Sequence, residues 1–243
     1  MTTSDAAFKS IWALIEAEAV DPGDKPDVVG WLQRLCRVAS RTLPAAGVGI
    51  SVMSTGGEPS TVAASDAQSA SVEDLQFTLG EGPCIDAYST GRAVFAPDLS
   101  VAARVRWPGY APAAQEHGVQ AAFSFPLQIG AARLGALDVY RHQPGSPSAE
   151  TIVQALTFAD VAMTGLLNAQ QRSNQGDGTP ALDEALDNRF ELYQAQGMVA
   201  VEMGIPLDEA MIRIRAYAYA QNRALGDVAD GIIAGKLTLQ TDT

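Results

Sequence analysis

The sequence predicts an α+β protein in two parts, a domain of sheet and helices followed by a small helical bundle. Three observations predict it. Residues 1–172 combine segments of period-two alternation with segments of helical period. A polar, glycine-containing stretch at 173–180 then interrupts the pattern. Residues 181–243 return to a helical period. We therefore expect one domain at 1–172, a flexible linker at 173–180 and a helical domain at 181–243.

Composition bounds the functions open to the chain. Its 243 residues carry 16 basic and 28 acidic side chains, a net charge of −12, which argues against a broad basic surface for nucleic acid. The two cysteines, Cys36 and Cys84, are too few for a disulfide framework. The N-terminus does not resemble a signal peptide, and no apolar run approaches the ~20 residues of a membrane span. We expect a reduced, cytoplasmic protein with no membrane partner.

The first domain is predicted to begin with two helices, at 4–20 and 26–42, and to continue as a sheet with helical excursions. A long helix is predicted to start at Ser146-Pro147, with a capping hydroxyl and a proline at its first position, and to end near Gln171. This order predicts an antiparallel sheet with helices to one side. The strands are expected at 47–54, 61–64, 93–96, 121–127 and 133–141, and the short helices at 72–77, at 85–89 and from Trp107 toward His117.

The C-terminal part is predicted to form three helices. The first ends at Gly204, because glycine accepts the left-handed conformation common after a helix, and Pro206 suits the first turn of the second. The third runs from Asp227 to Ile233 and stops before Gly235. The inward stripe of the second helix has helical spacing and consists of Leu207, Ala210, Met211, Ile214 and Ala218.

Arginine and tyrosine gather on the other side of the second helix. Arg215, Tyr219 and Arg223 share a face with Ile212, and Arg213 lies four residues before Tyr217 on a flank. A guanidinium group can neutralise a phosphate, and both side-chain types can stack on a splayed base. Exposed aromatic residues also tend to mark an interaction surface. The pattern fits an RNA-binding face, and it also fits a protein-binding face or an ordinary solvated surface.

Several motifs here resemble the ANTAR domain, a three-helix module of bacterial regulators that binds RNA and controls transcription antitermination. They are 195–198 (Ala-Gln-Gly-Met), Glu209-Ala210, 213–218 (Arg-Ile-Arg-Ala-Tyr-Ala) and 222–229, within a resemblance that covers about 182–237. Many family members have a lysine where this chain has Gln196, so a charge-based contact is missing there. The resemblance implies RNA contacts from Gln196, Gly197, Arg213, Arg215, Tyr217, Tyr219, Asn222 and Arg223.

The first domain resembles a GAF domain. The resemblance rests on the element order, on 79–84 (Leu-Gly-Glu-Gly-Pro-Cys) and on 135–140 (Gly-Ala-Leu-Asp-Val-Tyr) in the last strand. Such domains are sensors with a pocket on one face of a sheet, often for a small molecule, and with terminal helices that dimerise. The resemblance implies an unidentified small-molecule ligand. Its expected contacts are Cys84, Trp107, Tyr110 and Phe123, for which the alternative is ordinary core packing.

No catalytic motif can be recognised. Neither His117 nor His142 stands at a sequence spacing from a cysteine, a serine or an acidic pair that is typical of a catalytic site. The sequence has no phosphate-binding glycine loop, no paired-cysteine zinc site and no helical histidine pair. We therefore expect a protein that is not an enzyme, with no catalytic residue, no metal site and no cofactor.

Together the sequence predicts a regulator in which a GAF sensor controls an ANTAR output domain. Residues 181–243 contain 10 acidic and five basic side chains, a net of −5, so we expect RNA binding to need two copies side by side, as a homodimer. The resemblance to the ANTAR domain implies that the RNA is a paired stem-loop structure. One alternative is a protein-interaction or dimerisation module that does not bind RNA, which Gln196 and the acidic balance motivate. Another, a DNA-binding helix-turn-helix, is disfavoured because Asp208 and Glu209 would repel phosphate.

Overall fold

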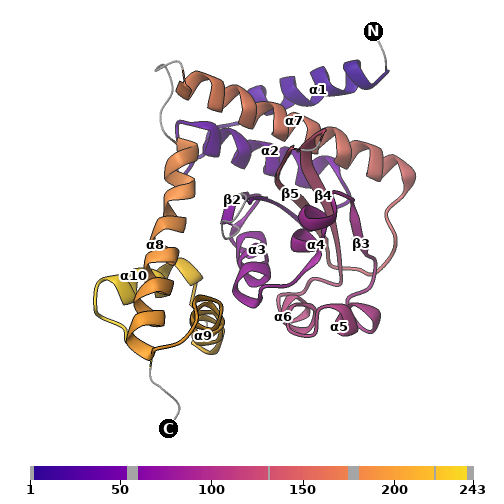
Figure 1. The fold of residues 1–243 in the computed structure, drawn as a ribbon. Helices are drawn as coiled ribbons and strands as arrows, with labels where there is room; N and C mark the ends of the chain where they lie inside the picture. Colours follow the sequence, from indigo (N-terminus) through magenta and orange to yellow (C-terminus); the bar gives the residue numbers. More distant parts are fainter. Residues whose placement is uncertain (1–2, 54–59, 131, 175–180, 222, 240–243) are drawn as a thin grey trace.

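The computed structural model describes residues 3–53, 60–130, 132–174, 181–221 and 223–239, with side chains outside 3–4, 173–174 and 181–190. A central sheet with helices against it forms the first part, and a bundle of three helices stands beside it (Figure 1). Helix α7 (Ala149–Asn174) extends two residues into the predicted linker. The rest of that linker, 175–180, lies outside the described residues.

The predicted antiparallel sheet is confirmed. Its strand order is β2-β1-β5-β4-β3, and every neighbouring pair is antiparallel. Strand β5 lies at the centre, between β1 and β4, so its side chains point alternately toward the elements that cover the two faces of the sheet. The strands are β1 (Gly47–Val52), β2 (Ser60–Ala64), β3 (Val94–Ala96), β4 (Ala121–Ile129) and β5 (Ala132–Arg141).

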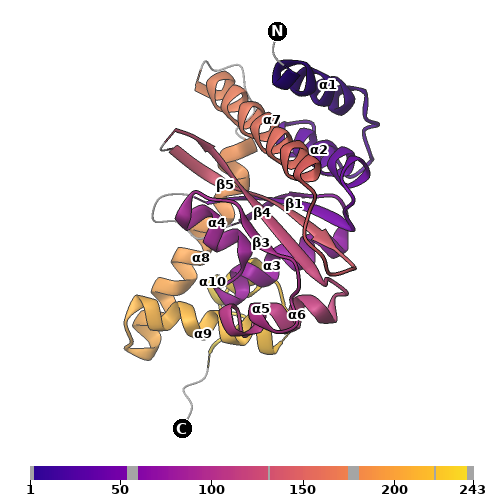
Figure 2. The same cartoon turned by 90° about the vertical axis from the view of Figure 1, so that its right-hand side faces the viewer.

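Helices cover both faces of this sheet, so the prediction of helices to one side was wrong. Helix α1 (Thr3–Ala17), α2 (Val28–Thr42) and α7 lie over one face. The other face carries α3 and α4 together with two short helices, as Figures 1 and 2 show. The physical reason is that β1 is buried at every position, and a strand buried on both sides needs cover on both sides. The helices of the second face are α3 (Ala67–Leu79), α4 (Pro83–Thr90), α5 (Ala102–Arg106) and α6 (Tyr110–Glu116).

Helix ends follow local capping chemistry. Asp27 caps α2, because its Oδ1 accepts from the amide of Val29 at 2.7 Å. Helix α7 begins three residues later than the predicted Ser146-Pro147 start, and the hydroxyl of Ser148 accepts from the Thr151 amide at 3.1 Å. Helix α5 was not predicted, since five residues are too few to show a helical period.

Each face of the sheet has its own core. Apolar residues of α1, α2 and α7 pack against alternate residues of β1, β4 and β5, including Ile50, Phe125 and Leu137. The opposite residues of the same strands face α3, α4 and α6. By length and composition α7 is the one described helix that could cross a membrane, but half of its apolar stretch is buried inside the protein. Its apolar character is thus explained by core packing.

The predicted three-helix bundle is confirmed, with α8 (Ala181–Met203), α9 (Leu207–Ala220) and α10 (Leu225–Ile233). Gly204, at φ +65°, ends α8 as expected, while Pro206 precedes α9 and is not its first residue. The inward stripe of α9 is buried except for Leu207, which is exposed. The bundle core also includes Leu192, Ala195 and Val199 of α8.

Candidate functional site

One side of α9 is open to solvent. Ile212 and Tyr219 are 62% and 50% exposed, and Arg223, just after the helix, is exposed as well. The guanidinium of Arg223 donates from Nη2 to the carbonyl of Asp227 at 2.8 Å, which directs the side chain along the start of α10. These three residues form what we call the outer face of α9. Asn222, also predicted to contact RNA, lies outside the described residues.

Four other predicted RNA contacts are only partly accessible. Arg213 pairs with Glu209 at 3.2 Å, one helical turn earlier, and Tyr217 packs partly against the bundle core. Gln196 donates from Nε2 to the carbonyl of Leu207 at 2.7 Å, so it joins α8 to the first residue of α9. Gly197 is half-buried, and a Cβ there would meet nothing within 4 Å. Gly197 therefore leaves space beside Gln196 for a ligand or for a larger residue.

Arg215 lies between the two domains. Helix α9 contacts α3, and the Arg215 guanidinium lies beside Gly80, which caps the C-terminal end of α3. A Cβ at Gly80 would stand 2.9 Å from Nη1 of Arg215, and Gly80 also has a φ of +71°, so both space and conformation favour glycine. A cation at a helix C-terminus is stabilised by the helix dipole. This contact half-buries a residue predicted to meet RNA.

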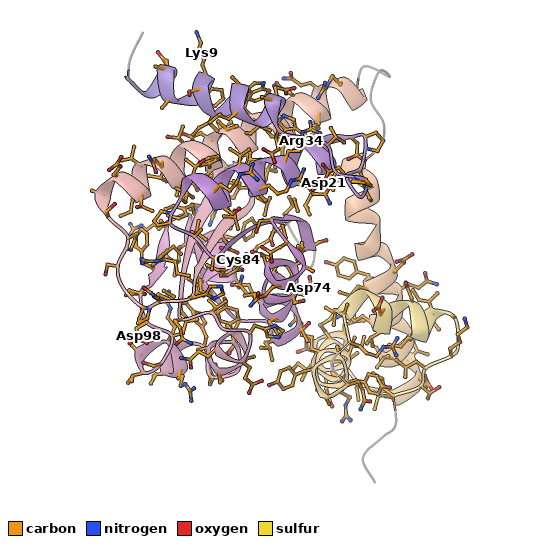
Figure 3. All side chains as sticks on the ribbon, turned by 180° about the vertical axis from the view of Figure 1, so that it is seen from behind. Lys9, Asp21, Arg34, Asp74, Cys84 and Asp98 are labelled. Atoms are coloured by element: carbon orange, nitrogen blue, oxygen red, sulfur yellow. The ribbon has the colours of Figure 1, made fainter. Side chains whose placement is uncertain are left out.

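A second contact of α3 brings two acidic groups toward each other. Asp74 of α3 accepts a 2.7 Å hydrogen bond from the hydroxyl of Thr61. Burial, and then the charge of Asp227 at the start of α10, raise the pKa of Asp74 above its ordinary value. Figure 3 labels Asp74 on the side of α3 that faces the bundle. The interface between the domains thus combines a favourable contact at Arg215 with an unfavourable one at Asp74.

The inner side of α3 contributes to a buried polar cluster. Ser51 donates to Oε2 of Glu73 at 2.5 Å, and the Tyr140 hydroxyl donates to Oε1 of Glu73 at 2.6 Å. Gln76 donates from Nε2 to Oδ2 of Asp138 at 3.2 Å. Each of these side chains is at most 2% exposed. The buried polar cluster, as we use the term, consists of Ser51, Glu73, Gln76, Cys84, Tyr110, Ser124, Asp138 and Tyr140.

Strand register explains why these residues meet. Asp138 of the central strand has Ser124 of β4 as its partner on one side and Gly49 of β1 on the other. A Cβ at Gly49 would stand 2.0 Å from Oε1 of Glu73, so glycine makes room for that carboxyl group. The amide of Cys84 donates to Oε1 of Gln76 at 2.8 Å and ties α4 to α3. Figure 3 shows Cys84 inside the first domain.

Burial controls protonation in this cluster. It raises the pKa of Glu73 well above its ordinary value, and the charge of Asp138 raises it further. Burial also raises the pKa of Asp138, although the nearby Ser124 hydroxyl and other polar groups oppose the shift. The Cys84 thiol has its pKa raised well above its usual range by burial and by the two neighbouring carboxyl groups. The isolated cluster therefore favours neutral, protonated groups.

The predicted ligand contacts separate into three groups. Cys84 and Tyr110 both belong to the buried polar cluster. Trp107 packs edge-on against Tyr110 at 6.4 Å between ring centroids, and its Nε1 donates to Asp86 at 3.1 Å. Trp107 also helps to line an open, largely apolar hollow of about 310 Å³ between β3 and α5. Phe123 packs in the core on the opposite face of the sheet, so the structure does not bring it to the others.

Sequence reasoning missed most of the cluster. Asp138 and Tyr140 alternate with apolar residues in a strand, and a carboxyl group within an otherwise apolar strand could have been noticed, since buried acids are uncommon. Glu73 and Gln76, three residues apart on one helix, give no comparable signal. Glu81, in the turn before α4, has a structural role: its Oε1 accepts from the amides of Gly109 and Tyr110 at the start of α6.

Comparison with known proteins supports both halves. The GAF domain model matches residues 27–166, more than half of the chain, and the ANTAR domain model matches 181–233. A comparison with curated proteins gives no match.

Two solved structures share the fold of the first domain. The GAF domain of a phosphoenolpyruvate-protein phosphotransferase from Coxiella burnetii is 15% identical, with a TM-score of 0.54, and the likeness covers 70% of this chain and 96% of that one. The corresponding domain from Acinetobacter is 13% identical, with a TM-score of 0.51, covering 70% and 97%. At such identities the likeness concerns the fold alone. The chain belongs to the GAF domain family and carries at its C-terminal end an ANTAR domain, the RNA-binding module of transcription antitermination regulators.

Proposed function

We propose that this protein is a signal-responsive transcription antitermination regulator, in which the GAF domain controls RNA binding by the ANTAR domain of a homodimer. The observation that carries the proposal is the position of α9. Its outer face, with Tyr219 and Arg223, is open to a ligand, while Arg215 on the same helix is held against the GAF domain. The bound RNA would be a paired stem-loop that stacks its loop bases on tyrosine and places phosphates near arginine.

Helix α3 offers a physical route from signal to output. One side of it supplies Glu73 and Gln76 to the buried polar cluster, and its C-terminal end receives Arg215. A change in the cluster that shifts or rotates α3 would alter the surface on which α9 lies. We propose that the contact restrains RNA binding and that the signal weakens it. In energetic terms, the signal has to bind the undocked arrangement more tightly than the docked one.

The test is a fluorescence-anisotropy titration of the full chain with a two-stem-loop RNA, a scrambled RNA of equal length and two salt concentrations. We expect the stem-loop RNA to bind more tightly than the scrambled one, with an affinity that falls as salt rises. Tyr219→Ala and Arg223→Ala should each weaken binding by about five- to 150-fold, as loss of a stacked base or of a phosphate contact costs ~1–3 kcal/mol. Equal affinity for both RNAs would overturn the proposal.

Hydrogen exchange tests the restraint separately. If RNA competes with the GAF domain for α9, then adding the stem-loop RNA should speed amide exchange in the last turn of α3, residues 76–80. Exchange in α2, on the far side of the sheet, should not change and serves as the internal control. Unchanged exchange in α3 at saturating RNA would show that docking and RNA binding are compatible, and would remove the restraint from the proposal.

A second candidate function is a protein-interaction module without RNA binding. The docking of α9 on α3 favours it, because this contact already uses an arginine of the predicted RNA face. The Gln196→Lys variant distinguishes the two functions. Stem-loop binding gained only by the variant would mean that the domain keeps the fold of an RNA binder and lacks one charged contact. No discrimination by either protein would favour the protein-interaction module.

A further inference from the structure

Three metal-ligating side chains converge in the GAF domain. One oxygen each from Glu73 and Asp138 and the sulfur of Cys84 all lie within 4.8 Å of one another. They come from α3, β5 and α4, and each residue is at most 1% exposed. Such a span leaves room for an ion at the centre but not for an organic molecule. No short metal-binding motif in the sequence indicates this group, because Cys84 follows Glu73 by 11 residues and Asp138 follows Cys84 by 54.

Polar atoms in the cluster lack partners. Within the described part of the chain, Oδ1 of Asp138, the Tyr110 hydroxyl and Oγ of Ser124 are buried and make no hydrogen bond of acceptable geometry. Ser124 nevertheless lies close enough to Asp138 to oppose the rise of its pKa. Buried polar atoms are rarely left unpaired in native proteins, and each exception calls for an explanation such as an ion or a water molecule. Asp138 therefore has an oxygen to offer to a ligand in this cluster.

The surrounding residues hold the carboxyl groups in place. Glu73 accepts from Ser51 and Tyr140, one donor on each oxygen, and Asp138 accepts on Oδ2 from Gln76. Gln76 is itself oriented by the Cys84 amide. Metal ligands in proteins are commonly oriented by outer hydrogen-bond partners of this kind. The same bonds leave Oδ1 of Asp138 available for coordination.

The chemistry of the donors selects the class of ion. The hydrogen-bond donors to Glu73 and Asp138 are all neutral groups, so a cation would supply the missing positive charge. One thiolate with two carboxylates suits a divalent ion of borderline softness, whereas Mg²⁺ and Ca²⁺ prefer oxygen ligands alone. Zinc, with bonds of about 2.3 Å to sulfur and about 2.0–2.2 Å to oxygen, would draw the three groups slightly together.

We propose that Glu73, Cys84 and Asp138 form a binding site for one divalent transition-metal ion such as Zn²⁺. The ion would bind the thiolate of Cys84 and one oxygen of each carboxylate, and it would connect α3, α4 and β5. Because α3 also contacts α9, occupancy would act on the element that joins the two domains. The site itself does not depend on RNA binding, and its test uses no RNA.

The test uses the full chain, freed of metal with a chelator, and Zn²⁺ and Co²⁺ as probes. Because the cluster is buried, metal is added both to the folded protein and during refolding. We expect one ion per chain by elemental analysis, a higher thermal midpoint with Zn²⁺, and a thiolate-to-cobalt charge-transfer band in the near ultraviolet. Failure to retain either ion after both treatments would overturn the proposal, as would equally tight binding of Mg²⁺.

Matched variants locate the ion. Cys84→Ala should abolish the charge-transfer band, while Cys36→Ala should leave the band and the stoichiometry unchanged, because Cys36 packs in the core on the other face of the sheet. Asp138→Asn should keep the thiolate band but weaken Zn²⁺ binding by more than about tenfold. If Cys84→Ala does not fold, as judged by circular dichroism, Cys84→Ser and Asp138→Asn carry the test. Stoichiometric binding that survives both the cysteine and the aspartate changes would place the ion elsewhere and overturn the proposal.

Discussion

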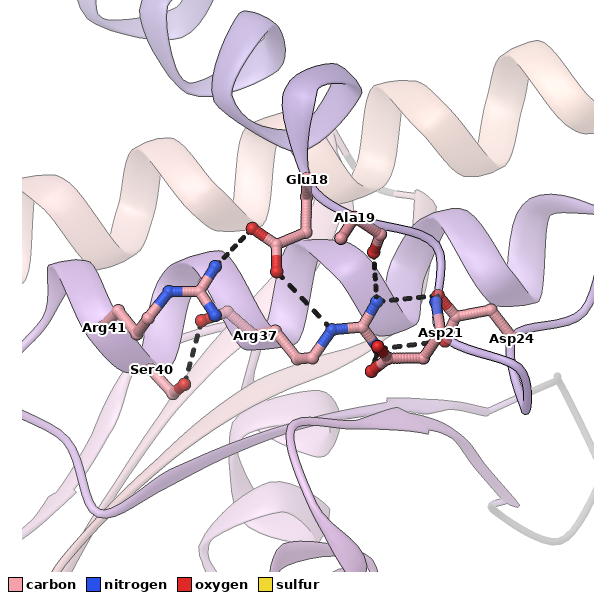
Figure 4. Close-up of polar contacts among 7 residues, drawn as sticks. All are labelled: Glu18, Ala19, Asp21, Asp24, Arg37, Ser40 and Arg41. Atoms are coloured by element: carbon pink, nitrogen blue, oxygen red, sulfur yellow. Dashed lines mark hydrogen bonds and ion pairs between the residues drawn. The ribbon is translucent and has the colours of Figure 1, made fainter.

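At the scale of single residues, Arg37 of α2 shows how one side chain can hold an element in place. Its guanidinium donates to both carboxylate oxygens of Asp24, at 2.9 and 2.7 Å, and to the carbonyl of Ala19 at 3.1 Å (Figure 4). Glu18, one residue after the end of α1, lies 3.7 Å from Nε of Arg37 and also pairs with Arg41. These contacts connect the segment after α1 to α2, which itself covers the sheet.

The Asp24–Arg37 pair should make stability depend on pH. The hydrogen bond from Arg37 lowers the pKa of Asp24 in the folded protein. Its stabilisation is therefore present above the ordinary pKa of an aspartate and is lost as the pH falls through the lowered value. We expect Asp24→Asn to reduce the free energy of unfolding by about 1–3 kcal/mol at neutral pH. The free energy of unfolding of the variant should also fall less steeply with decreasing pH, as measured by chemical denaturation between neutral and acidic pH.

Asp21 provides the matched control for Asp24. It pairs with the same guanidinium at 3.4 Å, but its side chain is 59% exposed whereas that of Asp24 is 3% exposed. Solvent screens an exposed pair, so Asp21→Asn should cost no more than about 0.5–1 kcal/mol. Equal losses for the two variants would show that burial of Asp24 does not decide the strength of the contact.

Gln196 should have a structural role as well as its proposed contact with RNA. Its amide bonds the Leu207 carbonyl, so Gln196→Ala should lower the stability of the bundle by about 0.5–1 kcal/mol, followed by chemical denaturation. Gln196→Lys keeps a donor and should lose less. A Gln196→Ala variant as stable as the parent protein would argue that the bond to Leu207 is not needed.

At the scale of elements, α3 contacts both the rest of the GAF domain and the C-terminal bundle. It contributes Glu73 and Gln76 to the buried polar cluster, ends at Gly80 beside Arg215, and brings Asp74 near Asp227. We therefore expect the loss of any α3 contact to affect both the buried polar cluster and the contact with the C-terminal bundle. In the proposed docked arrangement, the Arg215 contact and the acidic repulsion act in opposite directions.

Substitution of Asp74 should favour docking. The raised pKa of Asp74 means that its protonated form stabilises the folded arrangement below the ordinary pKa, and that this stabilisation is lost as the pH rises through the raised value. Asp74→Asn removes the charge at neutral pH while its amide oxygen can still accept from Thr61. We expect slower amide exchange in α9, a gain on the order of 1 kcal/mol, and weaker RNA binding. Asp230→Asn, exposed on α10, is the control, and faster exchange in the Asp74 variant would contradict the argument.

At the scale of the whole molecule, charge and exposed apolar surface both argue for paired copies. A chain of net charge −12 has little general attraction for RNA, so we expect binding to depend on local clusters of arginine and on the number of copies that present them. On α8, Val201 is 85% exposed and Met198 and Tyr193 are each 39% exposed. These residues lie outside the bundle core, and we propose that they form the dimer surface.

Val201→Glu should break the proposed dimer. A buried, unpaired carboxylate at an apolar interface is costly, so we expect the dimer dissociation constant to rise by at least about tenfold, measured by analytical ultracentrifugation, with little change in the thermal midpoint. Val105→Glu, on α5 of the GAF domain and also 85% exposed in the parent, should leave the oligomeric state unchanged. A full-length protein that is monomeric throughout would contradict the dimer and the avidity argument for RNA.

The sequence by itself determined most of the elements, although not helix α5, and it determined the family. The strand patterns at 47–54 and 133–141, the Gly204 break between α8 and α9, and the motifs around Gln196 and Arg213 are all local, and the structure and the family models agree with them to within two residues at the strand ends. The spacing of apolar residues along one helix or strand indicates which of its sides is buried. This spacing correctly predicted the residues that α9 contributes to the bundle core, except Leu207, which lies in the first turn, where a helix end is less enclosed.

Only the tertiary structure decided which distant residues meet. Glu73, Cys84 and Asp138 come from three elements, and they converge because strand register and the empty space at Gly49 allow it. Register likewise turned Phe123 away from Tyr110, although both had been predicted to contact one ligand. The Arg215–Gly80 contact depends on how two domains pack. Each of these pairings is set by the packing of elements far apart in the chain, and the period of a single element carries no information about its partner.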